Sequence, residues 1–577
     1  MVNAGGGADA SVIRADVVVV GGGPVGMVLA LELGRRGVAT VLVCDRQGTS
    51  PYPQANATQA RTMEHFRRLG LAQRIRAQGL PPEYPTDIAY FTRYATHELA
   101  RLRLPSSRDA ASMVRTLSGS WSAAELPHRC AQMFIEAVLL DALRAQPTVR
   151  LMHGWRATRF EQDADGVRVR IEPVAPQTPD AAGAHAHANT ARPMRVDAAY
   201  LAGCDGAHSA VREHLGVDYA GQAGVVRDFM GGRMHAVYFR SPDLYQVMRH
   251  PPAWMYWAFN EQRRSFMVAI DGRSEFVYHA QIKPGEDDAA ITDERARAMV
   301  FASLGSVCRV DIVSRSSWTA GHALVAQRMG ERRMFLAGDS AHLFTPTGGL
   351  GYNTGVDDAI NLGWKLAAVV RGLAEPSLLD SYELERRPVA QRNTAFARAL
   401  ADSIGTYTPA PGLEDDTCEG SVLRARAGEY LARHAQAEFD IPGITFGARY
   451  DGSPLITGDG EAPPSDRANV YEPSAVPGGR PPHLWLADGQ SLFDRFGSEF
   501  TLLDTGEDDA TSAALQAQLG RTRWPVRWVG VESGTLRRLY GRRYALIRPD
   551  QIVAWRGDSP PDDFSALLRR VMHYRSA

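Results

Sequence analysis

The chain is poor in cysteine and shows no excess of either charge. Its five cysteines are spread over 577 residues without a Cys-x-x-Cys pair. An odd, scattered set excludes a disulfide framework and the usual zinc-binding spacings, so we expect free thiols and no bound metal. Lysine and arginine together number 64, against 65 for aspartate and glutamate. This balance offers no basic surface for nucleic acid or for an anionic membrane.

Long uninterrupted apolar runs are also absent. The most apolar stretch near the start, residues 15–33, is broken by four glycines and Pro24 and contains Glu32. A membrane span needs about 20 largely apolar residues, and a secretory signal needs a basic start and a small-residue cleavage site. These absences predict a cytoplasmic protein without a membrane partner. The length predicts roughly two to four domains.

A dinucleotide-binding pattern opens the chain. Residues 15–20 form a β-branched run typical of a buried parallel strand. A Gly-x-Gly-x-x-Gly turn, a helix predicted over 27–36 and a second strand over 39–44 follow. In such a unit the glycines allow a tight turn, a close backbone approach to a pyrophosphate and close helix–strand packing. The candidates for cofactor contact are Gly21, Gly23, Pro24, Val25 and Gly26.

An acidic residue closes this unit. Asp45 follows the second strand, 19 residues after Gly26, where a carboxylate would accept a hydrogen bond from an adenosine ribose 2′-OH. The same charge would repel a 2′-phosphate, so the site favours FAD or NAD(H) over NADP(H). We include the neighbouring Arg46 among the cofactor-binding candidates.

Two later blocks extend the cofactor site. Asp205-Gly206 follows an apolar strand, and Gly338-Asp339 ends another. Asp339 can hydrogen-bond to sugar-like hydroxyls. After it, a glycine-dense turn precedes a helix predicted over 356–371. The bare backbone between 348 and 353 can approach a flat ring and donate N–H groups to its carbonyl edge, where they would stabilise negative charge.

These three motifs, in this order over more than 300 residues, resemble the single-component (group A) FAD-dependent aromatic hydroxylases, the phenol hydroxylase-like flavoprotein monooxygenases. In that family the first motif binds the ADP half of FAD, the Asp-Gly motif lies near FAD and NAD(P)H, and the Gly-Asp motif holds the ribityl chain. Residues 59–64 and 129–136 resemble two further FAD segments. The resemblance adds as cofactor-binding residues Gln59, Arg61, Gln132, Asp205, Gly206, Gly338, Asp339, Pro346, Gly349, Gly351, Tyr352 and Asn353.

The chain departs from the family pattern at two positions. Gln54 stands where the family has arginine, which removes a positive contact to phosphate or nicotinamide. Leu350 stands where the flavin loop has glutamine, so a role for that amide does not carry over.

The resemblance also implies an activity. FAD would be bound non-covalently, NADH or NADPH would dock transiently, and O2 would yield a flavin C4a-hydroperoxide that hydroxylates a small phenolic substrate. A tailoring oxygenase of polyketide or antibiotic biosynthesis shares every flavin motif and is the alternative. A flavin-binding protein without turnover is a third interpretation. We expect a monomer or a homodimer.

The predicted fold is α/β: a Rossmann-type FAD-binding domain, an inserted β-sheet substrate domain and a C-terminal thioredoxin-like α/β domain. Strands are predicted over 233–239, 254–259 and 265–270, and their aromatic residues suit a flat substrate. The tail contains no cofactor motif, so we expect it to serve assembly or stability. The predicted boundaries are 1–86, 104–217 and 319–405 for the FAD-binding domain, 87–103 and 218–318 for the substrate domain, and 406–577 for a linker plus the C-terminal domain.

The motifs leave open which residue activates the substrate. Five residues before Arg61, related phenol hydroxylases carry an ionisable Asp or His, and this chain has Asn56. An amide can orient a phenol but cannot take its proton. Either another base serves, with His235 and Tyr256 as candidates, or the substrate is already acidic and Asn56 merely orients it. We favour the second explanation.

Overall fold

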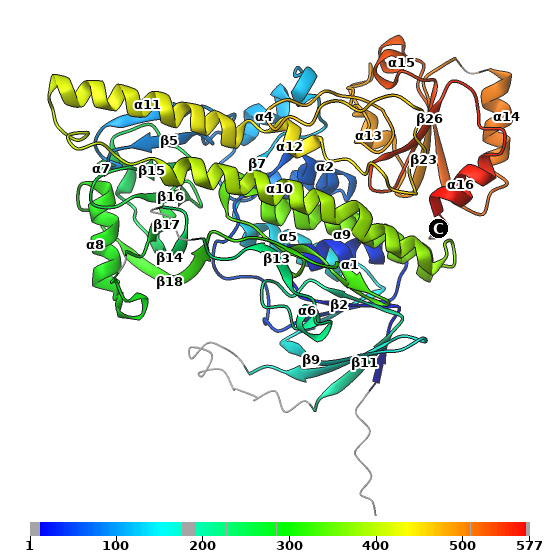
Figure 1. Ribbon diagram of the computed structural model, residues 1–577, viewed down its shortest axis with the longest axis horizontal. Coiled ribbons are helices and arrows are strands. Elements are labelled where there is room, and N and C mark those ends of the chain that lie inside the picture. The colour runs from blue at the N-terminus through cyan, green and yellow to red at the C-terminus, as the bar shows by residue number, and fades with distance from the viewer. Residues whose placement is uncertain (1–11, 176–191, 226–228, 284, 508, 573–577) are drawn as a thin grey trace, which may run out of the picture.

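The computed structural model describes residues 12–175, 192–225, 229–283, 285–507 and 509–572. Three sheet-based units lie side by side, with two long helices running along the molecule beside them (Figure 1). Among these residues no helix combines the length and the apolar character that a bilayer crossing requires.

The first unit is built on a six-stranded sheet in the order β20-β21-β12-β2-β3-β8, parallel except for β20. The valines of β2 are buried because layers cover both faces of the sheet, as the β-branched run predicted. The strands are β2 Val17–Val20, β3 Thr40–Cys44, β8 Val149–His153, β12 Tyr200–Gly203, β20 Gly330–Glu331 and β21 Met334–Leu336.

Helices and small sheets surround this sheet. Helix α1 (Pro24–Gly34) packs between α5 (Gln132–Arg144) and α9 (Leu350–Val370), and a four-stranded sheet packs against β2 and β3. The smaller strands are β1 Val12–Arg14, β9 Trp155–Gln162, β10 Val167–Pro173 and β11 Met194–Ala198, together with β13 Tyr219–Gln222, β19 Ala323–Ala326 and β22 His342–Leu343, and the pair β4 Ala57–Thr58 and β7 His128–Arg129.

The second unit is a seven-stranded mixed sheet in the order β18-β14-β17-β16-β15-β5-β6. The three strands predicted within 233–270 are confirmed as β14, β15 and β16. Helix α8 (Asp293–Leu304) covers one face, where the Tyr278 hydroxyl donates to the Met299 carbonyl at 3.2 Å. The strands are β5 Ile88–Phe91, β6 Glu98–Leu102, β14 Gly232–Arg240, β15 Met255–Ala258, β16 Ser265–Ala269, β17 Glu275–Gln281 and β18 Asp311–Ala320.

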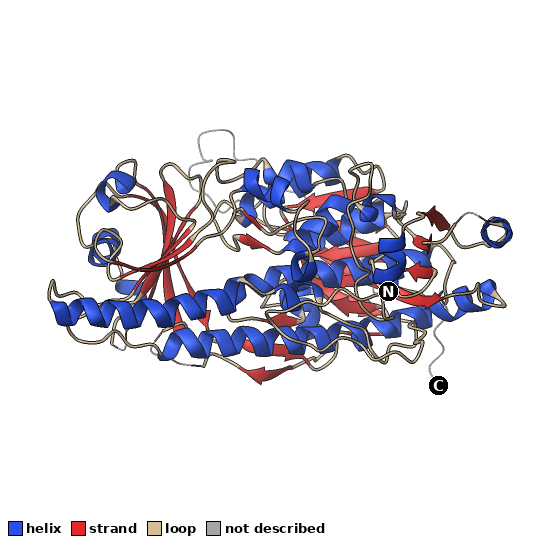
Figure 2. Ribbon diagram, turned by 90° about the horizontal axis from the view of Figure 1, so that it is seen from above, coloured by secondary structure: helices blue, strands red, loops and turns tan. Residues whose placement is uncertain are grey.

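The segment predicted as a linker contains a long helix. Helix α10 (Ser381–Thr406) is followed by α11 (Cys418–Phe439), which lies over β5 and β6 (Figures 1 and 2). Helix α11 lies so close to β6 that a side chain at Gly428 would overlap the carbonyl oxygen of Leu99. The Gly, Pro and Asp residues that suggested a linker flank α11 instead of filling the segment. The substrate sheet therefore has a helical cover contributed by this part of the chain.

The third unit is a four-stranded sheet in the order β24-β23-β25-β26, with β23 and β24 parallel and the others antiparallel. Its core includes Trp364 and Ala368 of α9, so it shares apolar surface with the first unit. Its elements are β23 Phe500–Asp504, α14 Ala510–Leu519, β24 Val526–Gly530, α15 Gly534–Tyr540, β25 Tyr544–Ile547, β26 Val553–Gly557 and α16 Phe564–Met572.

Short helices complete the described structure. They are α2 Ala60–Arg68, α3 Ala72–Arg76, α4 Ser107–Met113, α6 Ala210–His214, α7 Leu244–Met248, α12 Pro442–Phe446 and α13 Leu492–Arg495.

Candidate active site

The turn between β2 and α1 depends on glycine. Gly21 adopts φ +112°, and a side chain there would overlap the carbonyl oxygen of Cys204. A side chain at Gly26 would overlap the carbonyl oxygen of Gly21. Because Gly21 and Gly26 have no side chains, β2, α1 and β12 can pack closely here, as the motif predicted.

The same turn leaves an open cradle. A Cβ atom at Gly23 would meet nothing within 4 Å. Helix α1 begins at Pro24, so the N–H groups of Val25 and Gly26 lie in the first turn, which lacks partners within its own helix. A helix N-terminus with free N–H groups and open space before it suits a pyrophosphate.

Polar residues line the adjoining edge. Asp45, partly exposed at the end of β3, accepts a hydrogen bond from an arginine of β9 at 3.3 Å. Arg46 donates to the Gly22 carbonyl at 3.1 Å and pairs with Glu136 at 3.2 Å. Gln132 donates to the same Glu136 carboxylate at 2.8 Å. The structure thus gathers three of the predicted residues beside the glycine turn.

The Asp-Gly motif shapes a second turn. Asp205 accepts hydrogen bonds from the Ser209 hydroxyl at 2.5 Å and from the Val211 N–H at 3.2 Å, and so supports the start of α6. Burial raises the pKa of Asp205, although its hydrogen bonds oppose this. Gly206, with φ +83°, reverses the chain. Within the described structure this carboxylate orders the turn.

The Gly-Asp motif presents a carboxylate without a partner. The Asp339 side chain is exposed, and among the described residues it has no hydrogen bond or ion pair. Only its backbone carbonyl is engaged, by the Tyr219 hydroxyl at 2.6 Å. Desolvation by the surrounding protein raises the pKa of Asp339, although the charge of the nearby His342 opposes this. The exposed side chain could accept hydrogen bonds from the hydroxyls of a bound chain.

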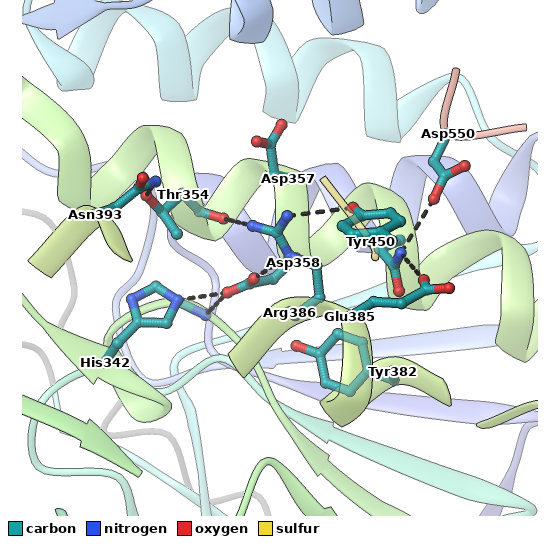
Figure 3. A network of polar contacts seen from close by, with 12 residues as sticks. His342, Thr354, Asp357, Asp358, Tyr382, Glu385, Arg386, Asn393, Tyr450 and Asp550 are labelled. Atoms are coloured by element: carbon teal, nitrogen blue, oxygen red, sulfur yellow. Dashed lines mark hydrogen bonds and ion pairs between the residues drawn. The ribbon is translucent and has the colours of Figure 1, made fainter. Parts of the chain in front are cut away.

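A buried network holds this motif in place (Figure 3). Asp358 of α9 accepts from the Gly338 N–H at 3.1 Å, and the same oxygen contacts His342 Nε2 at 2.6 Å. Its other oxygen accepts from Arg386 Nε at 2.7 Å, and Arg386 also donates to the Tyr450 hydroxyl at 3.2 Å. Sequence reasoning missed Asp358 and Arg386, although both lie in blocks that resemble the family, because their roles depend on α9 packing against α10.

The flavin loop is fixed by two amide side chains. Gln59 donates through its backbone to Asn353 Oδ1 and through its side chain to the Gly348 carbonyl, both at 2.8 Å. Asn353 in turn donates to the Ala57 carbonyl at 2.9 Å. A side chain at Gly349 would meet the Cβ of Ala57 at 2.8 Å. Gln59 and Asn353 therefore hold the loop against β4 through their own contacts.

Helix α9 begins six residues earlier than predicted, at Leu350. The N–H groups of Gly351 and Tyr352 consequently belong to a helical first turn, whose donors have no intrahelical partner and lie at the positive end of the helix dipole. Pro346, at the start of the loop, is exposed. Part of the segment 348–353, which the sequence predicted as bare backbone before the helix, is therefore the N-terminus of α9.

The described residues fit FAD. The open cradle at Gly23 suits its pyrophosphate, the unpaired Asp339 carboxylate suits its hydroxylated chain, and the N-terminus of α9 suits the carbonyl edge of a flat ring.

Arg61 lies elsewhere than the sequence suggested. Its buried guanidinium donates to the Asp550 carbonyl at 2.8 Å and to Gln551 Oε1 at 3.0 Å, both in the C-terminal unit. Helix α2 directs this side chain across a domain interface and away from the glycine turn.

His235 and Tyr256 lie on the face of the sheet that α8 covers. His235 Nδ1 contacts Ser317 Oγ at 3.1 Å and Asp288 at 3.3 Å. The Tyr256 hydroxyl accepts from the Ala253 N–H at 2.7 Å. Side chains alternate between the two faces of a strand, so both point the same way as Tyr278, toward α8. The structure does not bring them to the flavin loop.

Asn56 lies close to that loop. It precedes Ala57 of β4, and its carbonyl accepts from the Cys130 N–H at 3.1 Å. Its half-buried side chain makes no hydrogen bond to the part of the chain that the structure describes. The amide is therefore free to bind a ligand.

The opposite face of the sheet carries a row of aromatic side chains. Phe266 stacks on His279 with ring centroids 4.5 Å apart, and Trp318 Nε1 donates to His279 Nδ1 at 3.2 Å. Burial lowers the pKa of His279 to about 3, and His235 adds to this effect. His279 is thus neutral, with its proton on Nε2. Sequence reasoning missed it, since only the alternation along β17 places it on this face.

Comparisons with known proteins agree with this geometry. Residues 14–397 match the family model of the FAD-binding domain, and residues 474–573 match that of the aromatic-ring hydroxylase C-terminal domain. A putative polyketide hydroxylase of Streptomyces halstedii is 30% identical, with 97% of each chain covered. The 2,4-dichlorophenol 6-monooxygenase of Delftia acidovorans is 28% identical, with 98% of this chain and 99% of the relative covered.

A solved structure is similar over the same extent. It is the rebeccamycin biosynthetic enzyme RebC with bound 7-carboxy-K252c, which matches with a TM-score of 0.84 and 34% identity over 97% of this chain and 99% of RebC. The cradle, the free Asp339 carboxylate and the match over two thirds of the chain lead to one conclusion: this protein belongs to the family of FAD-dependent aromatic-ring hydroxylases.

Proposed function

We propose that the protein hydroxylates a phenolic ring with NAD(P)H and O2. The observation that carries this proposal is a chain of contacts from the flavin loop to the substrate sheet. Gly349 packs on Ala57, Ala57 pairs with Arg129 across the β4–β7 ladder, and the Arg129 guanidinium lies 4.5 Å from the Trp254 ring centroid. A ring held by the loop would therefore lie beside the aromatic sheet.

Each part of the site would have a defined task. Bound FAD supplies the redox chemistry that activates O2 after reduction by a nicotinamide. The first-turn N–H groups of α9 stabilise negative charge on the ring's carbonyl edge, and the free carboxylate of Asp339 anchors the hydroxylated chain. The sheet and α11 exclude water from the ring. Asn56 orients the phenol oxygen. The sequence has no second glycine motif, so the nicotinamide docks transiently.

A fused-ring substrate is the second candidate. The sheet face opposite α8 offers a continuous aromatic surface. On it Tyr90, Trp257 and Phe259 are mutually stacked, with ring centroids 6.0 to 6.3 Å apart. One of the relatives above is a putative polyketide hydroxylase. Such a surface could hold several rings, which would make the protein a tailoring oxygenase.

The test measures NADH and NADPH oxidation by the FAD-loaded protein with one-ring and fused-ring phenols. We expect a phenol to stimulate oxidation and to gain one oxygen atom from 18O-labelled O2, detected by mass spectrometry. If no phenol in the panel is converted, the protein is a flavin-binding protein without this turnover. We further propose a monomer or homodimer acting in the cytoplasm, which gel filtration and cell fractionation would test.

A further inference from the structure

Arg129, the last residue of β7, is a buried cation without a polar partner. Only 5% of its surface is exposed. Across the described ranges, its guanidinium makes no hydrogen bond and no ion pair, and Nη1 is sealed from solvent. Its contacts are with rings, Trp254 at 4.5 Å and Phe439 at 5.9 Å from the centroids. Aromatic faces attract a cation but satisfy none of its five N–H donors.

Other buried arginines of the chain are paired. Arg386, Arg480 and Arg548 each bind a carboxylate at 2.6 to 2.7 Å. Burying a guanidinium without such a partner destabilises a protein, so the arrangement calls for an explanation. Burial lowers the pKa of Arg129 to about 10, and the charge of Glu438 opposes this effect. The side chain therefore remains charged at neutral pH.

The neighbouring carboxylate is committed elsewhere. Glu438 Oε1 accepts from the Gly348 N–H of the flavin loop at 2.9 Å, and its Oε2 contacts His434 Nε2 at 2.9 Å. Neither oxygen forms an ion pair with the guanidinium in the described structure, which leaves a cation between the flavin loop, the substrate sheet and α11. Two titratable groups interact with the guanidinium electrostatically, Glu438 on α11 and His128 on β7. Glu438 in turn interacts with His434 on α11 and with Tyr90 on β5.

We propose that Arg129 binds the ionised oxygen of the aromatic substrate. This inference rests on the proposed function and names the residue that activates its substrate. The phenol releases its proton to water, and the guanidinium holds the phenolate by a charge-assisted hydrogen bond. A cation at this position lowers the pKa of a bound phenol. The Arg129 charge would explain how the site activates a phenol although Asn56, which precedes Ala57 of β4, cannot take a proton.

The experiment uses the FAD-loaded protein and 4-nitrophenol, whose phenolate absorbs visible light. The variants are Arg129→Met, Arg129→Lys and, as a matched control, Arg263→Met. Arg263 is a buried arginine of the neighbouring substrate sheet, but it is paired with Glu286 at 2.6 Å. Absorbance titrations at several pH values give the affinity and the pKa of the bound probe. Thermal melting and FAD absorbance are recorded for each variant.

We expect the wild type to bind the probe as phenolate, with its pKa lowered by about one unit. Arg129→Met should abolish this shift and weaken binding about 10- to 100-fold, while Arg129→Lys keeps part of it. Without ligand, Arg129→Met should melt at or above the wild-type temperature, because an unpaired buried charge is removed. Arg263→Met should melt lower and keep the shift.

A wild type that leaves the probe's pKa unchanged would overturn the inference, as would an Arg129→Met protein that retains the shift. Loss of FAD from Arg129→Met would assign the cation to the flavin's carbonyl edge and overturn it too. The titration needs no turnover. A probe shift without hydroxylation of any phenol would therefore contradict the proposed function alone.

Discussion

Arg480 donates hydrogen bonds to both carboxylate oxygens of Glu64, at 2.6 and 2.9 Å, and no more than 1% of either side chain is exposed. The pair joins α2 of the FAD-binding unit to the segment that leads into the C-terminal unit. A second buried cluster joins the same units, because Arg548 binds Glu385, which also accepts from Lys365 at 2.7 Å. The C-terminal unit is thus tied to the helices that support the flavin loop.

Deleting residues 474–577 should therefore prevent recovery of soluble FAD-loaded protein. The sequence predicted that this tail serves assembly or stability, and its loss would remove Arg480 from Glu64 and uncover Trp364 of α9. The milder variant Arg480→Met should destabilise folding by about 3–5 kcal/mol, since it breaks a buried ion pair and leaves Glu64 with only Arg61 and the Ala124 N–H. Thermal melting and FAD absorbance measure both. A soluble yellow truncation that melts like the intact protein would contradict this view.

The stability should fall in acid over a defined window. Burial alone would raise the pKa of Glu64, but Arg480 and Arg61 outweigh burial and lower the pKa from 4.5 to about 2. Glu32, between Arg68 and Arg36, behaves alike. A depressed carboxyl pKa stabilises the fold above pH 4.5, and this contribution is lost as the pH falls through about 2.

The measurement is the free energy of unfolding by urea at pH values across this window. Each of the two carboxylates should account for a loss of about 3 kcal/mol. The double variant Glu64→Gln/Arg480→Met removes one pair entirely, and its stability should depend less on pH. An equally steep dependence in the double variant would argue against the assignment.

Replacing Asp339 should weaken FAD binding without harming the fold. Its carboxylate has no partner in the described structure, so Asp339→Ala removes no protein contact. We expect FAD to bind about 10- to 100-fold more weakly, the range for a hydrogen bond to a charged group. Quenching of FAD fluorescence on titration into apoprotein gives the affinity. Asp339→Asn should lose less, and an unchanged affinity in both variants would remove Asp339 from the site.

Asn56 should decide orientation and leave proton transfer unaffected. With electron-poor phenols, which ionise readily, we expect tight coupling of product to NAD(P)H in the wild type and poorer coupling in Asn56→Ala. An amide can position a phenolate but cannot deprotonate a phenol. Product formed per NAD(P)H consumed is the readout. Tight coupling only with unactivated phenols, and no effect of Asn56→Ala, would oppose this role.

His235 and Tyr256 should matter for stability alone. Tyr256→Phe deletes a buried hydroxyl that accepts from the Ala253 N–H, and leaves that donor unsatisfied. We expect a loss of about 1–3 kcal/mol in folding and no change in the pH profile of turnover. His235→Asn should behave likewise. If turnover in either variant no longer rises with pH through the acidic side of the profile, that residue would return to the candidate bases.

The sequence by itself determined the parts of the site that a continuous segment can build. A valine strand, a glycine turn and a helix start lie within the first 26 residues, and the Gly-Asp turn and the flavin loop lie within 338–353. Such units form from short-range geometry: strand sterics, glycine turns and the unpaired donors of a helix N-terminus. The absence of a charge excess or of long apolar runs likewise needs no structure to be read.

Only the tertiary structure decided which side chains face the site and which face away from it. Arg61 looked like a cofactor residue, yet it donates to Asp550 and Gln551, which lie 489 and 490 residues further along the chain. His235 and His279 sit on neighbouring strands, and alternation directs one toward α8 and the other toward the aromatic face. Arg129 is recognised as a buried cation without a polar partner only in the described fold, where the nearby carboxylate of Glu438 is bound to other groups. Direction and pairing arise from packing between distant segments, which local sequence does not encode.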